Sequence, residues 1–208
     1  MGQLILQPDA TAGIDTWLDS SNPTVNQVTN AGFMVGSGTT DPARFRELCK
    51  FDLTSIPVGA TILSAILALT QYGSSLAGTF EIHRILAANA SWGEATATWN
   101  KRDGTNNWAG AAGCRTSGTD YAATAMWSGD PGTNNVLKNF TLDLTEFGLM
   151  WANNYGLIMF GSTITGGGGA NPYRFFRSSD YATAGDRPKL TVTWAEPRRR
   201  RIICGGDQ

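Results

Sequence analysis

The side chains that most often perform catalysis are scarce in this sequence. His83 is the single histidine, and no GxSxG or HExxH motif accompanies it, so neither a serine-based triad nor a histidine metal site is predicted. We expect His83 to be a surface or edge-strand residue. The three cysteines, Cys49, Cys114 and Cys204, are an odd number without CxxC spacing, which predicts neither a disulfide framework nor a zinc site.

Four aspartates are the remaining candidates for acid–base or metal chemistry. Asp9, Asp15, Asp19 and Asp180 could supply the carboxylate pair of a glycoside hydrolase, or oxygen ligands for calcium, which takes about six to eight of them. No DxDxDG spacing is present, so the metal ligands stay unassigned. We interpret the four side chains as solvated turn residues.

Three aromatic residues are the candidates for ligand binding. Trp108, Tyr121 and Trp127 lie in residues 100–135, a segment rich in Gly, Ala, Asn, Ser and Thr that has no apolar period. Sugars present apolar C–H faces to aromatic rings, so the three rings could form a stacking platform for a glycan. The alternative is that they anchor this long segment to the fold.

A basic and apolar run near the end of the sequence is the candidate for partner binding. It consists of Arg198, Arg199, Arg200, Arg201, Ile202 and Ile203. The run could be a solvated tail, an electrostatic hook for an acidic partner or a cloning remnant. We hypothesise that the arginines contact carboxylates of a neighbouring subunit while the isoleucines enter a groove on it.

The charge distribution separates this tail from the rest of the chain. The net charge is −1, and the four arginines with Asp207 give residues 197–208 a charge of +3, which leaves −4 on residues 1–196. A nucleic-acid-binding domain carries basic residues across a folded face, so nucleic acid is not expected as a ligand. We predict one folded domain over residues 1–196 and a basic tail over 197–208.

Alternation of apolar and polar residues predicts the elements that carry these side chains. A period of two is typical of a β-strand with one buried face. This period occurs in residues 44–53, 63–69, 80–82, 140–145 and 189–194. Shorter candidate strands are residues 3–7, 14–18 and 33–36.

Two of these segments carry more specific expectations. In residues 44–53, Phe45 and Cys49 would face the core while Arg44 and Arg46 face solvent. Residues 156–161 are apolar throughout, as expected of a strand that is covered on both faces.

Composition favours the same architecture. The 208 residues include 25 glycines, with 41% hydrophobic and 16% charged residues, which is typical of short strands joined by many turns. The best helical segment is residues 145–153, with Thr145 as its cap. No apolar stretch approaches the roughly 20 residues that span a bilayer. We therefore predict an all-β fold, a two-sheet antiparallel β-sandwich of jelly-roll type.

Several motifs, taken in order, resemble the disaggregatase-related (DNRLRE) family of β-sandwich domains. The motifs are FDLTSIPVGATI at 51–62, AILAL at 65–69, SWGEATATWN at 91–100 and FFRSSDYATAGDRPKLTVTW at 175–194. Within the third motif we expect Trp92 and Trp99 to fill the core and Glu94 to accept backbone N–H groups. The resemblance covers roughly residues 5–195 and ends before the basic tail.

The resemblance implies a jelly-roll-like sandwich without catalytic activity. Domains of this family are appended to secreted bacterial and archaeal proteins, often carbohydrate-active enzymes, and occur in phage structural proteins. Related modules bind polysaccharide, and a structural calcium ion is an implied cofactor.

The leading functional hypothesis is a non-enzymatic structural or adhesive protein of a phage virion surface. The N-terminal sequence MGQLILQPDA does not read as a signal peptide, which favours a protein made in the host cytoplasm and displayed as a head decoration, cement or fibre-like protein. Its partners would be copies of itself, other virion proteins or a polysaccharide. The alternatives are an extracellular carbohydrate-binding module of a polysaccharide-degrading protein and, third, a polysaccharide lyase or hydrolase.

Overall fold

The structure is a computed structural model that describes residues 1–37, 44–161 and 172–197. The strands are β1 (Gly2–Leu6), β2 (Ile14–Asp19), β3 (Gly32–Ser37), β4 (Arg44–Lys50), β5 (Thr61–Ser74), β6 (Phe80–Arg84), β7 (Trp127–Gly129), β8 (Leu137–Thr141), β9 (Leu157–Gly161), β10 (Tyr173–Arg177) and β11 (Lys189–Ala195). The helices are α1 (Leu144–Ala152) and two short 3₁₀ turns, η1 (Ala87–Asn89) and η2 (Ala184–Asp186).

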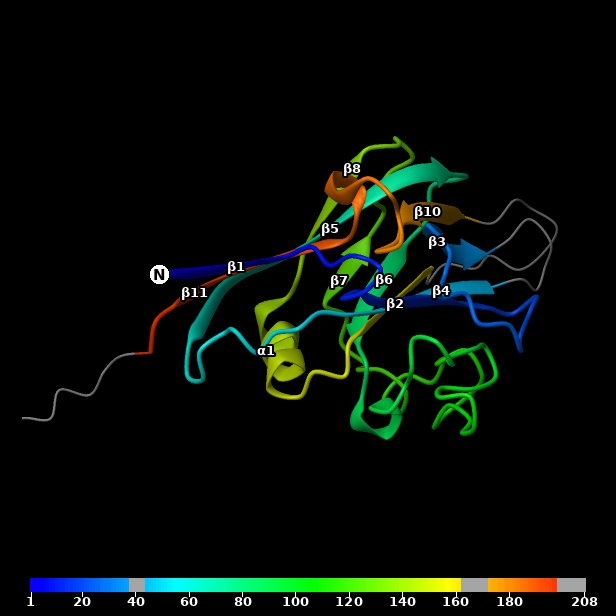
Figure 1. Ribbon diagram of the computed structural model, residues 1–208, viewed down its shortest axis with the longest axis horizontal. Coiled ribbons are helices and arrows are strands. Elements are labelled where there is room, and N and C mark those ends of the chain that lie inside the picture. The colour runs from blue at the N-terminus through cyan, green and yellow to red at the C-terminus, as the bar shows by residue number, and fades with distance from the viewer. Residues whose placement is uncertain (38–43, 162–171, 198–208) are drawn as a thin grey trace, which may run out of the picture.

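The strands form a curled antiparallel sheet that closes into two packed layers (Figure 1). Their order is β1-β11-β5-β10-β3-β4-β9-β6-β7, with β2 added to β4 and β8 added to β5. The long strand β5 links the layers, because its first part pairs with β11 and β8 while its last residues pair with β10. This arrangement confirms the prediction of an all-β, jelly-roll-like sandwich.

The main core lies between the two layers. It is built from inward-facing residues of most strands, including Phe80 of β6, Phe140 of β8 and Phe176 of β10. All residues of β9 are buried, which confirms that this strand is covered on both faces. Alternating burial along β11 confirms the prediction for that strand as well.

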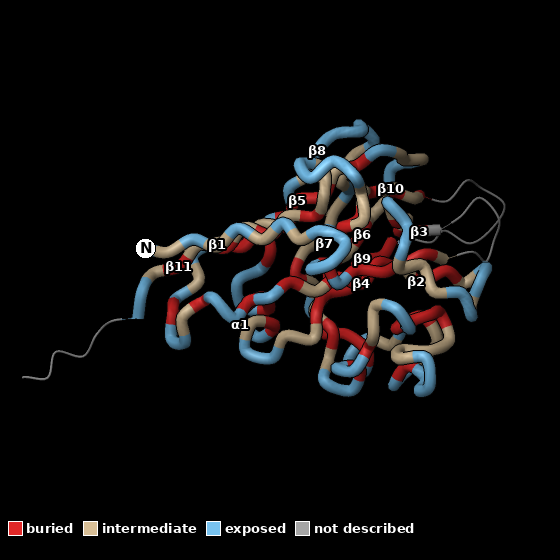
Figure 2. The backbone as a smooth tube through the Cα atoms, in the orientation of Figure 1, coloured by how far each residue is buried: buried red, intermediate tan, exposed pale blue. Residues whose placement is uncertain are grey.

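A second core covers the outer face of β2, β4 and β9 (Figure 2). The irregular chain between β6 and β7 lies over this face. Trp92, Trp99 and Trp108 come from that chain and pack against Leu48 and Ile158 of the sheet. Burial of Trp92 and Trp99 confirms that both indoles fill a core. The chain between β6 and β7 is therefore a structural layer.

This layer explains why the expectation for Arg46 is wrong. Arg46 was expected to face solvent from a half-buried strand, but it is buried on β4. Its Nη1 atom donates a hydrogen bond to the carbonyl oxygen of Cys114 at 3.0 Å, and its guanidinium lies 4.4 Å from the ring centre of Phe160. Alternation in the sequence does not show that another segment will cover the polar face.

Helix α1 closes one end of the main core. Asp143 caps it by accepting a hydrogen bond from the backbone N–H of Glu146 at 2.9 Å, so the prediction of Thr145 as the cap is wrong by two residues. Phe147 and Met150 pack into the core, and the Glu146 carboxylate accepts a hydrogen bond from Arg84 at 2.7 Å. Among the described helices, none has the length and apolar character needed to cross a bilayer.

Candidate functional site

His83 and the described cysteines are buried structural residues. His83 lies on β6, where Nδ1 is 2.7 Å from the carbonyl oxygen of Ala122 and Nε2 is 3.0 Å from a carboxylate oxygen of Glu81. The prediction of a surface or edge position is wrong, because the chain between β6 and β7 covers this side of the sheet. Burial raises the pKa of the Cys49 and Cys114 thiols, which keeps both protonated and unreactive. Cys204 lies outside the described residues.

The candidate aspartates hold the backbone. Asp15 is buried on β2 and accepts hydrogen bonds from the backbone N–H and hydroxyl of Ser179 at 2.8 and 2.7 Å. Asp19, also buried, accepts from the backbone N–H of Ser21 at 2.7 Å. The interpretation as solvated turn residues is therefore wrong for Asp15 and Asp19, whereas Asp9 is exposed in a turn.

The described residues do not fit a calcium ion. In residues 1–37, 44–161 and 172–197, no group of three or more carboxylate, histidine or cysteine side chains is placed to hold a metal. The carboxylate oxygens of Asp15 and Asp19 accept hydrogen bonds from backbone N–H and hydroxyl groups of the protein.

The three predicted stacking residues are anchors in the structure. Trp108 and Tyr121 are 3% and 8% exposed and pack in the second core, where the Trp108 indole donates a hydrogen bond to the Thr98 carbonyl at 3.0 Å. Trp127 lies on β7, and its ring centre is 4.7 Å from that of Phe140. Because two rings are buried and the third packs edge-on to a core phenylalanine, the three present no common platform to solvent. The positions of these three residues match the alternative that they anchor residues 100–135 to the fold.

A different set of aromatic residues gathers on the outer face of β10. The strand alternates, so Arg174 and Phe176 are buried while Tyr173, Phe175 and Arg177 point outward and are half-buried. Their ring centres place Tyr173 and Phe175 5.3 Å apart in an edge-on contact. Two aromatic rings and a guanidinium therefore follow one another along a single exposed strand face.

A β-bulge adds Tyr72 to this row. Phe175 pairs with Gly73 and Phe176 pairs with Gln71, so Tyr72 is an extra residue of β5 at this point. Such bulges re-aim a side chain out of the regular alternation. The ring centre of Tyr72 lies 5.6 Å from that of Phe175.

Arg177 joins the row to a further tyrosine. Its guanidinium lies 3.9 Å from the ring centres of both Tyr72 and Tyr181. Burial raises the pKa of Tyr72, and the neighbouring Arg177 charge offsets part of that rise, so the phenol stays neutral and can donate or accept a hydrogen bond. We call Tyr72, Tyr173, Phe175, Arg177 and Tyr181 the aromatic face.

Two glycines on neighbouring strands let these rings lie close to the sheet. Gly73 is opposite Phe175, and Gly32 on β3 is opposite Arg177. A Cβ atom on Gly73 would lie 2.7 Å from the Phe175 ring, and one on Gly32 would lie 2.5 Å from the Tyr72 hydroxyl. Any larger residue would push the rings away from the sheet.

Reasoning from the sequence missed the aromatic face, although part of its signal is readable. In the run YRFFR at 173–177, the period of two of a strand places Tyr173, Phe175 and Arg177 on one face. The contribution of Tyr72 depends on a bulge and on pairing between residues 100 positions apart, which alternation does not report. The predicted partner-binding residues, Arg198 to Ile203, lie outside the described residues.

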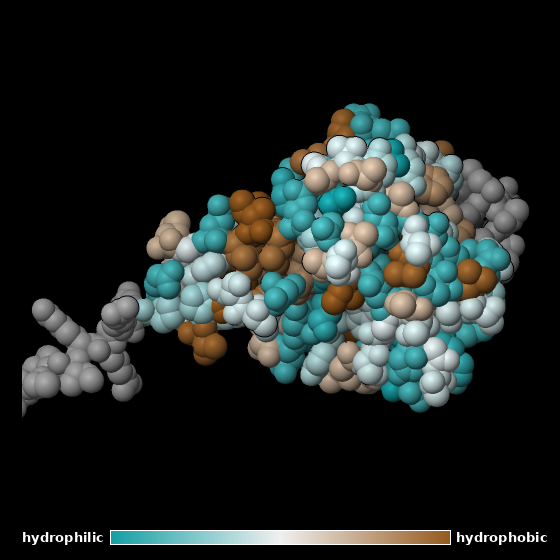
Figure 3. Space-filling model, in the orientation of Figure 1, coloured by the Kyte–Doolittle hydropathy of each residue, from teal (hydrophilic) through white to brown (hydrophobic). Residues whose placement is uncertain are grey.

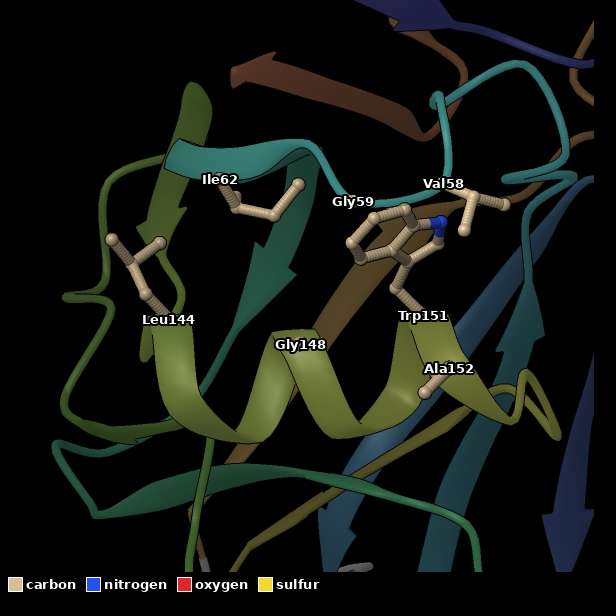
Figure 4. Close-up of a pocket in the computed structure, with 7 residues that line it drawn as sticks. All are labelled: Val58, Gly59, Ile62, Leu144, Gly148, Trp151 and Ala152. Carbon is tan, nitrogen blue, oxygen red and sulfur yellow. The ribbon is translucent and has the colours of Figure 1, made fainter. Parts of the chain in front are cut away.

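An apolar groove lies elsewhere, between α1 and the start of β5 (Figure 4). It has a volume of about 550 Å³ and is lined by Val58, Gly59, Ile62, Leu144, Gly148, Trp151 and Ala152. None of these side chains is charged, and only the Trp151 indole offers a hydrogen bond. A sugar needs several polar partners, so this apolar groove is a poor site for one.

Comparison with known proteins identifies the family. No curated protein matches the chain. The sequence profile described as carbohydrate-binding module family 96 matches residues 7–126, which include β2 to β6, the chain that covers the second core and Tyr72 of the aromatic face. Because the match spans more than half of the 208 residues, this chain belongs to carbohydrate-binding module family 96.

Proposed function

We propose that the domain binds a polysaccharide across the aromatic face. The observation that carries the proposal is the row of half-exposed rings at Tyr72, Tyr173 and Phe175 beside the Arg177 guanidinium. Apolar faces of sugar rings stack on aromatic side chains, and tyrosine hydroxyl and guanidinium groups supply hydrogen bonds for sugar hydroxyl or carboxylate groups. Membership of a carbohydrate-binding family supports this assignment.

The shape of the face favours a chain of sugars over a single sugar. Alternate residues of one strand lie about 6.6 Å apart, so the rings form a line along β10 and are not gathered around one point. Rings have few rotatable bonds, so they lose little conformational entropy when they bind. An extended glycan could lie along this line.

Truncation of the rings tests the proposal. We expect Tyr72→Ala and Phe175→Ala each to weaken polysaccharide binding by about tenfold or more, because truncating a central aromatic residue costs roughly 2 kcal/mol and about 1.4 kcal/mol is a factor of ten. Affinity electrophoresis and titration calorimetry against a panel of neutral and acidic polysaccharides would measure the loss. Trp151→Ala, which removes a half-buried ring on α1, is the matched control.

If a polysaccharide binds the wild-type protein and both face variants with equal affinity, the ligand lies elsewhere and the proposal fails. A circular dichroism spectrum of each variant would verify that the fold is intact before binding is measured.

We further propose that binding occurs without cleavage of the glycan. The family is one of binding modules, and the chain's one histidine and its two described cysteines are buried in structural roles. Release of reducing ends or unsaturated products from a bound polysaccharide by the purified protein would contradict this proposal.

Display on a phage virion, and association with copies of itself or with other virion proteins, stay predictions. Their support is the resemblance of the motifs to domains that occur in phage structural proteins. Mass spectrometry of purified particles would test the location. Size-exclusion chromatography with light scattering would test self-association.

A further inference from the structure

The apolar groove beside α1 leaves hydrophobic side chains uncovered. Val58 is 95% exposed at its rim, and Leu144 is 40% exposed at the start of the helix. The lining of this groove also includes Ile62 and Trp151, both of which pack against the main core on their other side. The groove is therefore an open end of the core, and apolar side chains placed in it would extend that core.

The groove lies beside the end of the sandwich from which the last described residues leave. There β1, β11 and the first residues of β5 project from the body, and apolar surface gathers next to them (Figure 3). Ala195 at the end of β11 pairs with Thr61. Two residues later, Pro197 lies against the groove, since a Cβ atom on Gly59 would be 3.8 Å from the Cβ of Pro197.

The sequence that follows Pro197 fits the groove in length and in chemistry. Four arginines lead to Ile202 and Ile203. Five residues in extended conformation span up to roughly 17 Å, so Ile202 can reach a groove whose rim is beside Pro197. The described groove has no Lys or Arg in its lining, and the exposed carboxylate of Asp143 precedes Leu144 at its helical side. The arginines therefore meet no positive charge there.

We propose that Ile202 and Ile203 occupy this groove in their own chain. The tether is short, so the isoleucines are held near the groove at an effective concentration in the millimolar range, which favours the same chain over a second copy. Burying two branched aliphatic side chains against Val58, Leu144 and Trp151 removes apolar surface from water on both sides. The proposal does not depend on glycan binding.

A disulfide trap that uses the chain's own Cys204 tests this placement. Ala152 is exposed and lines the groove, so the variant Ala152→Cys puts a thiol beside the proposed position of the tail. Cys49 and Cys114 are buried and do not compete. Under mild oxidation we expect a disulfide between residues 152 and 204 within a monomer, identified by peptide mass spectrometry.

A matched control separates docking from random collision. Leu149 is exposed on α1 but does not line the groove, so Leu149→Cys should form the disulfide at least tenfold more slowly. Replacing Ile202 and Ile203 together by Asp should slow the reaction of Ala152→Cys to the same rate as this control. Equal rates at positions 149 and 152 would overturn the proposal. Disulfides found only between two chains would also overturn it and would favour exchange of tails between copies.

Discussion

Glu47 is a buried carboxyl group without a hydrogen-bond partner in the described part of the chain. It lies on the inner face of β4, 2% exposed, between the two layers of the sandwich. Neither carboxylate oxygen has a hydrogen-bond partner among the described residues. Burial raises the pKa of Glu47 well above its ordinary value, and the nearby charges of Asp15 and Glu94 raise it further. Glu47 is therefore protonated in the folded protein under conditions in which the unfolded chain is ionised.

This raised pKa predicts how stability depends on pH. The folded state binds the Glu47 proton more tightly than the unfolded state, so its contribution is fully present below the ordinary glutamate pKa and is lost as pH rises toward the raised pKa. Glu47→Gln has no ionisable group at this position, so the loss of folding stability with rising pH is removed. We expect it to raise the melting temperature at pH 7 by a few degrees, since roughly 1 kcal/mol of stability corresponds to 2–4 °C in a domain of this size.

The same variant should have a much smaller effect at pH 4, where Glu47 is mostly protonated in both states. Thermal unfolding of wild type and variant between pH 4 and pH 8 would measure the difference. Glu196→Gln, at an exposed carboxylate, controls for the loss of one charge. An equal effect of Glu47→Gln at all pH values would contradict this explanation.

Strand β10 has two faces with separate roles, one in stability and one in binding. Its inner face carries Arg174, whose side chain is fully buried. That guanidinium donates to an Asp130 carboxylate oxygen at 2.7 Å, and to the carbonyl oxygens of Leu76 at 2.7 Å and Gly132 at 2.9 Å. One side chain thus ties two loops to the strand. The outer face carries the rings and Arg177.

Substitutions on the two faces should separate stability from binding. Arg174→Met removes the hydrogen bonds that a fully buried guanidinium donates to two loops, so we expect it to destabilise the domain by about 3 kcal/mol and lower the melting temperature by roughly 6–12 °C. Arg177→Met removes a half-exposed guanidinium and should change the melting temperature by less than about 2 °C. The second variant should weaken glycan binding instead. Calorimetry of both variants, with and without glycan, would show whether the roles divide in this way.

The elements also show what sequence patterns can and cannot predict. Alternation located β5 and β11, because one face of each meets the core and the other meets solvent or a polar neighbour. The strand predicted at residues 140–145 is wrong for most of its length, because β8 ends at Thr141 and α1 begins at Leu144. It failed at Arg46, His83 and Asp15, because distant segments cover the second face of their strands. The anchors Trp92 and Trp99 were predicted correctly because indoles are costly to expose. The aromatic face depends on strand pairing and a bulge, which a single sequence does not encode locally.

At the scale of the whole molecule, two cores share one layer of strands. Leu48 and Ile158 belong to the second core, while Cys49 and Leu157, their neighbours in sequence, belong to the main core. The chain that covers the second core is held by Asp120. Its two carboxylate oxygens accept hydrogen bonds from the backbone N–H groups of residues 110, 111 and 116 and from the side chain of Asn89.

Because the cores share strands, loosening the cover should destabilise the entire domain. Burial alone would raise the pKa of Asp120, but these hydrogen bonds outweigh it and hold the pKa below its usual value. Asp120→Asn replaces one accepting oxygen by an amide and leaves two N–H groups unpaired. We expect a loss of roughly 2–4 kcal/mol at neutral pH in one cooperative transition.

Below the lowered pKa the wild-type carboxyl is itself protonated, so the difference between wild type and Asp120→Asn should shrink as pH falls through that value. Differential scanning calorimetry would measure both effects. Asp52→Asn, at an exposed turn carboxylate, should change little. Two separate transitions in Asp120→Asn would contradict the coupling of the cores.

The pairing of β1 with β11 has a mechanical consequence. Gly2 lies opposite Trp194 and Leu6 opposite Leu190, so β1 and β11 run antiparallel with the start of β1 beside the end of β11. A force that pulls these two ends apart would load one pair of ladder hydrogen bonds at a time, as in opening a zipper, and would meet little resistance. The aromatic face lies on β10, toward the opposite end of the domain (Figure 1). If the domain is attached to a surface through the start of β1 or the end of β11, the aromatic face stays free. Tension between that surface and a bound polysaccharide would then be carried across the sheet.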